Sequence, residues 1–216
     1  MSQGVNIELS GNLGQQLFQY AAGRALSTLG GRLSLSKAEG IDYRPVLFTK
    51  SYEQLARATT VYVQKSHLEP WTPERFRGVD VLFCRGKFQY IPALEPVLPF
   101  LKEELLASLH PIRQQLVAKY NIRMRKRAAF VYVTKDKPQD YYESVIAKMS
   151  AKKSIHVYIL SDDPWIQGQP WLHGYTFIDE PELYALAFMS LCEGGSVGDT
   201  PLSWWGALLS TGNQTI

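Results

Sequence analysis

The sequence predicts an α/β protein in which helices cover the faces of parallel β-sheets. The first observation is a strand–turn–helix–strand unit that opens the chain, from Val5–Leu9 to residues 32–36. The second is the alternation of strand-like apolar runs with segments of helical periodicity in the second half. The third is the position of the polar and glycine-rich clusters. They follow strands or precede helices, where ligands bind in parallel sheets.

In the first half, Val5–Leu9 alternates apolar and polar residues, which predicts a strand. A turn at residues 10–14 follows, and helical spacing begins at Gln16 and ends at Gly30-Gly31. The stretch 39–77 is polar and rich in proline, which predicts irregular structure. The remaining elements expected here are strands at residues 32–36 and 81–84 and a helix at residues 94–109, broken around Pro99.

The second half contains three expected strands, at residues 128–133, 155–160 and 175–178. Helical spacing is expected at residues 112–120, 140–149, 183–191 and 202–209. We place a domain boundary near residues 109–112, which divides the chain into domains 1–108 and 109–216.

Composition excludes several classes of protein. A net charge of +3 and a pI near 8.8 are too mild for a dedicated nucleic-acid binder. The two cysteines do not make a disulfide scaffold, and the four histidines stand far apart, so we expect no metal site. The N-terminus lacks the pattern of a signal peptide and no apolar run is long enough to span a bilayer, which predicts a cytoplasmic protein. Nothing in the sequence specifies an oligomeric state.

The first candidate binding segment is the glycine turn Gly11-Asn12-Leu13-Gly14-Gln15-Gln16, which precedes a helix. Glycine lets backbone N–H groups approach a ligand, and a helix N-terminus attracts an anion, so the segment can contact a phosphate or a sugar. A tight strand–helix turn has the same appearance, and the pattern by itself favours the turn.

Two further segments stand at the carboxyl side of predicted strands. Asp162 and Asp163 can bind a sugar hydroxyl, a guanine edge or Mg²⁺, or they can cap the next helix. Thr200 and Ser203 can donate to phosphate oxygens at a helix N-terminus, or Thr200 can be a plain cap. Trp204 and its neighbour Trp205 point to different sides of a helix, so that one can enter the core while the other lines a cleft.

The basic run at residues 123–127 admits a nucleic-acid contact, but such a run is typical of a solvated loop before a strand. No spacing in the sequence indicates a Ser-His-Asp hydrolase.

Four segments in the same order resemble one family along nearly the whole chain. Residues 11–26 (GNLGQQLFQYAAGRAL) are similar to GGLGNQMFQYAxGRAL, and residues 86–90 (GKFQY) to G-Y-F-Q. Residues 159–165 (ILSDDPW) are similar to F-S-D-D-x-x-W, and residues 182–209 to D-L-Y-L-M-S-x-C followed by S-T-F-S-W-W-G-A-W-L. These are motifs of glycosyltransferase family 11, the α-1,2-fucosyltransferases.

The resemblance implies two Rossmann-like domains that face each other across a cleft, a GT-B-like arrangement. The N-terminal domain would be on the acceptor side, and the C-terminal domain would hold a GDP-sugar. The reaction would move L-fucose from GDP-fucose to a glycan hydroxyl with inversion, with no metal and no other cofactor. The expected donor-binding residues are Gly14, Gln16, Asp162, Asp163, Thr200, Ser203 and Trp204, and the catalytic candidates are Gln15 and Lys135.

The sequence departs from the family at its H-x-R-R-G-D motif, where this chain reads Tyr132-Val133-Thr134-Lys135-Asp136-Lys137. Lys135 keeps a positive charge but cannot form the bidentate contact that Arg forms with a diphosphate. Asp199 adds a negative charge where phosphate is expected, which is unfavourable unless it points away. Two hypotheses follow, an active GDP-sugar transferase and an inactive relative that serves as a binding or interaction module.

Overall fold

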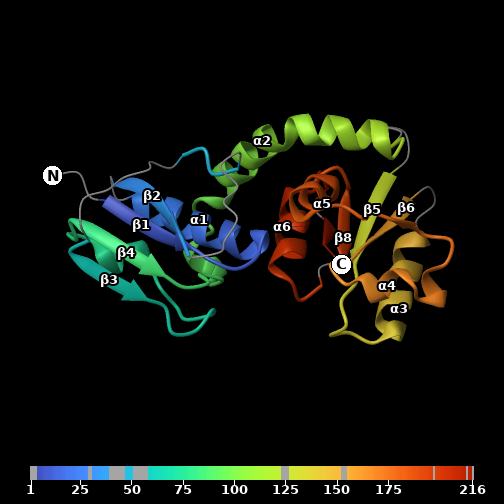
Figure 1. Ribbon diagram of the computed structural model, residues 1–216, viewed down its shortest axis with the longest axis horizontal. Helices are drawn as coiled ribbons and strands as arrows, with labels where there is room; N and C mark the ends of the chain where they lie inside the picture. Colours follow the sequence, from blue (N-terminus) through green and yellow to red (C-terminus); the bar gives the residue numbers. More distant parts are fainter. Residues whose placement is uncertain are drawn as a thin grey trace. The chain divides into compact units, whose positions relative to one another are not determined.

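The computed structural model describes residues 4–28, 31–38, 47–50, 58–122, 127–151, 155–196, 198–212 and 214–215. The chain divides into two compact units, Met1–Leu105 and Leu106–Ile216. Each unit contains one sheet whose neighbouring strands are all parallel (Figure 1). The predicted α/β class, with two parallel-sheet units, is confirmed.

The sheet of the first unit has the strand order β2-β1-β4-β3. Its strands are β1 (Gly4–Leu9), β2 (Arg32–Lys37), β3 (Thr60–Val63) and β4 (Val81–Arg85), and helix α1 (Leu13–Ser27) connects β1 to β2. Gly23 lets α1 pack closely on this sheet, because a Cβ at this position would lie 2.5 Å from Leu33 Cδ1 and 2.9 Å from Ile7 Cγ1.

Helix α1 begins three residues earlier than the sequence predicted. The expected start was Gln16, but the Asn12 side chain accepts a hydrogen bond from Gln15 N at 3.0 Å and caps the helix at Leu13. Gly14 therefore lies inside the first helical turn and is buried. The expected end at Gly30-Gly31 falls partly outside the described residues.

Strand β3 lies in the stretch for which we predicted irregular structure, so that prediction was wrong at residues 60–63. The strand is at the edge of the sheet, and only Tyr62 is buried, while Val61 and Val63 are exposed. A four-residue edge strand with one buried side chain leaves too short an alternation to recognise. Two 3₁₀ turns follow in this unit, η1 (Pro73–Phe76) and η2 (Ile91–Ala93). Residues 39–46 and 51–57 of the stretch lie outside the described residues.

A single helix, α2 (Leu98–Lys119), replaces the two helical segments that the prolines suggested. Pro99 stands in its first turn, where the missing N–H would have no helical partner in any case. Pro111 stands in the interior, where it removes one backbone hydrogen bond without ending the helix. The predicted break at Pro99 was therefore wrong, and the expected boundary region at residues 109–112 is helical.

The sheet of the second unit has the order β7-β6-β5-β8-β9. Its strands are β5 (Arg127–Tyr132), β6 (Ile155–Leu160), β7 (Thr176–Phe177), β8 (Gly194–Ser196) and β9 (Gln214–Thr215). Its helices are α3 (Gln139–Ser150), α4 (Pro164–Gln167), η3 (Pro170–Leu172), α5 (Glu182–Met189) and α6 (Pro201–Leu209). The sequence did not predict β8, β9 or α4, which have two to four residues each.

Both faces of this second sheet are covered. On one face, Val131 and Ile159 pack with Tyr142 and Ile146 of α3 in a buried apolar cluster. On the other face, Tyr158 of β6 meets Phe188 of α5, with ring centroids 4.9 Å apart. A sheet that is buried on both faces explains why β5 and β6 are nearly continuous apolar runs in the sequence.

Helix α6 contains the two adjacent tryptophans. Trp205 is fully buried and Trp204 is half-buried, so one of the two enters the core as expected. Gly206 follows them because α6 packs directly on α5. A Cβ at position 206 would lie 2.4 Å from Met189 Sδ and 2.8 Å from Met189 Cβ.

We expect Gly206→Ala to destabilise the protein by about 1–3 kcal/mol, because the added methyl group overpacks the α5–α6 contact. The midpoint of thermal unfolding should fall by roughly 2–4 °C for each kcal/mol lost. The matched control is Gly168→Ala, where the nearest atom to a new Cβ is 3.7 Å away. Equal midpoints for the two variants would contradict the packing described for α6.

Candidate functional site

Three loops meet at the carboxyl edge of the second sheet. They follow β5 (residues 133–138), β6 (residues 161–163) and β8 (residues 198–200). Because β6, β5 and β8 are parallel neighbours, their carboxyl ends lie at the same edge. Ligands of open parallel sheets bind outside this edge.

An ion pair joins the first two loops. Lys135 Nζ lies 2.7 Å from Asp163 Oδ2, and 63% of the Lys135 side chain is exposed. The Lys135 ammonium holds the pKa of Asp163 below its usual range, with help from the Trp165 N–H. Asp163 also caps α4, since its Oδ1 accepts from Trp165 N at 3.0 Å. The sequence allowed Asp162 and Asp163 either to bind a ligand or to cap the next helix, and the structure shows that Asp163 caps α4.

A second ion pair joins the loops after β5 and β8. Lys137 Nζ lies 2.8 Å from Asp199 Oδ2, and this carboxylate raises the pKa of Lys137. The added negative charge of Asp199 is thus matched by a lysine in the neighbouring loop. Both lysines of the altered motif are bound to carboxylates.

Two other altered positions of the motif, Tyr132 and Thr134, are buried, whereas Asp136 is exposed. Thr134 N donates to the Tyr142 hydroxyl at 2.9 Å, which fastens the start of the loop to α3. Burial raises the pKa of Tyr132, and the nearby carboxylates of Asp162 and Glu182 add to the rise. Tyr132 and Thr134 are thus neutral residues of the interior, where the family pattern has ionisable side chains.

The N-terminus of α6 is held by a compact hydrogen-bond network. Thr200 is the N-cap, and its hydroxyl accepts from Ser203 N at 3.2 Å and donates to Ser203 Oγ at 2.9 Å. The Ser203 hydroxyl in turn donates to Gly198 O at 2.8 Å and is fully buried. The plain cap considered for Thr200 is therefore observed, and Ser203 positions the loop after β8.

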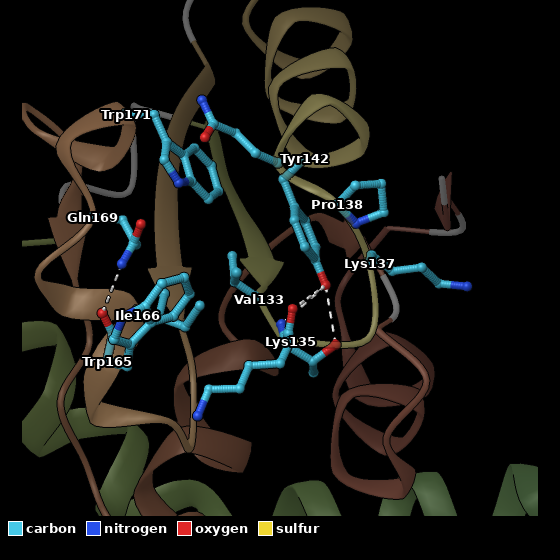
Figure 2. Close-up of a pocket in the computed structure, with 11 residues that line it drawn as sticks. Val133, Lys135, Lys137, Pro138, Tyr142, Trp165, Ile166, Gln169 and Trp171 are labelled. Atoms are coloured by element: carbon cyan, nitrogen blue, oxygen red, sulfur yellow. Dashed lines mark hydrogen bonds between the residues drawn. The ribbon is translucent and has the colours of Figure 1, made fainter.

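A pocket of about 470 Å³ opens beside the loops after β5 and β6. Figure 2 shows Tyr142 extending from α3 on one side and Trp165, Ile166 and Gln169 on the other. Lys135 crosses the mouth of the pocket, and its ammonium is 5.9 Å from the centre of the Trp165 ring. The lining residues are Val133, Thr134, Lys135, Lys137, Pro138, Gln139, Tyr142, Trp165, Ile166, Gln169 and Trp171.

The first unit has its own turn at the carboxyl edge of its sheet. Gly11 adopts φ 76°, where residues with a side chain are strained, and a Cβ there would lie 1.6 Å from the flexible end of the Gln15 side chain at Oε1. Gln16 is buried and its Nε2 donates to Gly11 O at 2.9 Å. The Oε1 atom of Gln16 is also buried and has no hydrogen-bond partner among the described residues.

Gln19 links this turn to the segment after β4. Its Nε2 donates to Ser10 Oγ at 2.8 Å and to Gly86 O at 2.9 Å, and its Oε1 accepts from Ser10 N at 2.9 Å. Two segments that resemble family motifs, residues 11–26 and 86–90, are thus joined by one fully buried amide.

The structure separates the predicted site residues into two groups. Gly14, Gln15 and Gln16 lie in the first unit, at the start of α1. The second group belongs to the carboxyl edge of the second sheet: Lys135, Asp162, Asp163, Thr200, Ser203 and Trp204. Lys137 and the pocket aromatics were not among the site residues predicted from the sequence. Their closeness in sequence to predicted residues could have indicated them, because Lys137 and Trp165 stand two residues after Lys135 and Asp163.

Within the part of the chain that the structure describes, no three His, Cys, Asp or Glu side chains are grouped so that they could hold a metal ion. Both cysteines are buried, and burial raises the pKa of Cys84 to about 12. In the same described residues, no helix is long and apolar enough to cross a membrane.

No family model and no curated protein matches this sequence. Several solved structures match the fold over nearly its whole length. NodZ α-1,6-fucosyltransferase co-crystallised with GDP has a TM-score of 0.64 at 10% identity, over 97% of this chain and 93% of that chain. Fucosyltransferase NodZ from Bradyrhizobium has a TM-score of 0.54 at 12% identity, over 97% and 94%. A mutant of Arabidopsis thaliana FUT1 in complex with GDP has a TM-score of 0.55 at 10% identity, over 98% and 69%.

The chain therefore has the α/β fold of these fucosyltransferases. At 10–12% identity the likeness is one of fold. Membership of glycosyltransferase family 11 stays a prediction from the motifs.

We expect the carboxyl group of Asp163 to titrate below the ordinary aspartate value of about 3.9. In Lys135→Met its pKa should rise, because the ammonium that stabilises the charged form is gone. The pair's contribution to stability is present above the unfolded pKa and is lost as the pH falls through the folded pKa. Carboxyl-carbon NMR titration of both proteins measures the shift, and an unchanged Asp163 pKa in the variant would refute the ion pair.

Proposed function

We propose that this protein is a glycosyltransferase of the α-1,2-fucosyltransferase type, which transfers L-fucose from GDP-fucose to a hydroxyl of a glycan with inversion. The observation that carries the proposal is the fold, which matches fucosyltransferases solved with GDP or GDP-fucose over 97% of this chain. The motifs that resemble family 11 supply independent support, because their polar residues stand at the carboxyl edges of the two sheets.

In this proposal the second unit binds the donor. The positive end of the α6 helix dipole and the exposed ammonium of Lys135 both favour a diphosphate at this edge. Asp162 is an exposed carboxylate in the next loop and can accept from a guanine or a sugar hydroxyl. The first unit then serves the acceptor side, as the motif order implies.

The chemistry requires charge stabilisation on the leaving group. As the bond from the sugar carbon to the diphosphate oxygen breaks, negative charge grows on GDP, and a fixed cation nearby lowers the barrier. Lys135 is our candidate for this role. The amide of Gln15 can orient a hydroxyl by hydrogen bonding, but it cannot remove a proton at neutral pH. We assign no metal to the reaction.

The ion pairs support a second candidate function, a non-catalytic relative that binds without turnover. Lys135 and Lys137 are already paired with Asp163 and Asp199, so a diphosphate must compete with two carboxylates for them. Thr134, where the family has an arginine, is buried and bonded to Tyr142. Both features weaken donor binding, and neither disturbs the fold.

Thermal unfolding with GDP, GDP-fucose, GDP-mannose and UDP, followed by transfer assays, tests the proposal. A ligand at a hundred times its dissociation constant adds about 2.7 kcal/mol of stability. At this chain length the midpoint should rise by several degrees, at roughly 2–4 °C per kcal/mol. We expect GDP and GDP-fucose to give this rise and UDP to give none. In Lys135→Ala the rise should shrink, whereas the control Lys148→Ala, an exposed lysine of α3 outside the pocket, should match the wild type.

The outcomes separate the two candidates. A guanine-nucleotide shift together with fucosyl transfer or donor hydrolysis supports the transferase. A shift without turnover across the donor panel supports the binding module. No shift with any nucleotide would overturn donor binding at this edge and, with it, the transferase.

A further inference from the structure

Three aromatic side chains, Tyr142, Trp165 and Trp171, line the 470 Å³ pocket in the second unit. Tyr142 and Trp171 are stacked, with ring centroids 6.2 Å apart and planes inclined by 15°. Trp165 stands opposite Tyr142 and is 58% exposed (Figure 2). Most of this indole is left in water beside a concave surface, so an occupant that covers its ring would gain apolar burial.

The polar groups of the pocket are mainly neutral. The amides of Gln139 and Gln169 lie on its walls, and each amide carries two N–H donors and an acceptor oxygen. Gln139 Nε2 donates to Glu143 Oε1 at 2.7 Å, which uses one of its N–H groups. Gln169 Nε2 donates to Trp165 O at 3.3 Å, which ties this amide to the exposed tryptophan. Amides of this kind match hydroxyl groups, which also donate and accept.

The two lysines that line the pocket are paired with carboxylates. The cations of Lys135 and Lys137 are held at 2.7 Å and 2.8 Å by Asp163 and Asp199, neither of which lines the pocket. No carboxylate is among the lining residues in the described part of the chain. A ligand here would meet aromatic faces and amides with little unbalanced charge, which disfavours strongly anionic or cationic ligands.

We propose that this pocket binds a pyranose ring of a neutral saccharide. The apolar C–H face of the sugar would lie on Trp165, and its hydroxyl groups would bond to the Gln139 and Gln169 amides. The volume lies in the range of small-molecule sites, about 300–1,000 Å³. The pocket is bounded by α3, α4 and η3, on the face of the sheet opposite α5. It is therefore a second carbohydrate site beside the proposed donor site at the N-terminus of α6, with Lys135 at the border of both. It does not depend on the protein being a transferase.

The test is to titrate the protein with saccharides and to monitor binding by ligand-observed NMR. The neutral ligands are lactose, N-acetyllactosamine, maltose and cellobiose, and sialyllactose is the anionic comparison. We expect at least one neutral disaccharide to bind more tightly than sialyllactose. Trp165→Ala should weaken that binding at least tenfold, and Trp165→Phe should retain part of it. Tyr175→Ala removes an exposed aromatic residue outside the pocket and should have no effect.

Gln139→Ala provides a second test if Trp165→Ala does not fold, and it should also weaken the binding. The inference is overturned if no neutral saccharide binds, if Trp165→Ala and Gln139→Ala bind normally, or if sialyllactose binds best. Competition between GDP and the saccharide would also overturn it, because the pocket would then belong to the nucleotide site. If the protein binds a neutral saccharide but not GDP, the proposed function is refuted and the saccharide site is still supported.

Discussion

The loop after β5 contains two lysines, and each is bound to a carboxylate from a different neighbouring loop. Lys135 holds Asp163 after β6, and Lys137 holds Asp199 after β8. These contacts exist because β6, β5 and β8 are parallel neighbours, which brings their carboxyl ends to one edge with β5 in the middle. The pairs join the three loops at that edge, and both lysines also line the 470 Å³ pocket. A nucleotide must exchange one set of carboxylate contacts for phosphate contacts, whereas a neutral sugar need not disturb them.

The substitutions in the altered motif are consistent with one another. Thr134 is buried, and its hydroxyl lies 3.1 Å from the Tyr142 hydroxyl, so this position holds a short neutral side chain. Asp199 adds a charge that Lys137 neutralises. Where the family 11 motif has a cation-rich loop, this chain has a loop whose two lysines are paired with carboxylates of neighbouring loops. Gln19 joins the loops of the first sheet, and Gly206 allows α6 to approach α5.

The sequence predicted the α/β class, strands β1, β2, β4, β5 and β6, and helices α1, α3, α5 and α6, because these elements leave a clear apolar pattern. It also predicted a strand at the position of the two-residue β7. It missed β3, β8 and β9, whose pairing depends on neighbours far away in the chain rather than on their own two to four residues. The start of α1 was misplaced because the Asn12 cap was interpreted as part of a turn. At the site, the sequence selected Lys135 and Asp163 but did not foresee that they form a pair. Which side chains meet at the edge of a sheet depends on how neighbouring strands are paired and aligned. The local sequence of each loop does not contain that information.

Backbone-amide NMR of the isotopically labelled protein during titration with GDP tests whether a guanine nucleotide binds at the carboxyl edge of the second sheet, as proposed. We expect the largest shifts in residues 133–138, 161–163 and 198–203, with little change at Trp171. Shifts confined to the first unit, or none at GDP concentrations that saturate a millimolar site, would contradict it.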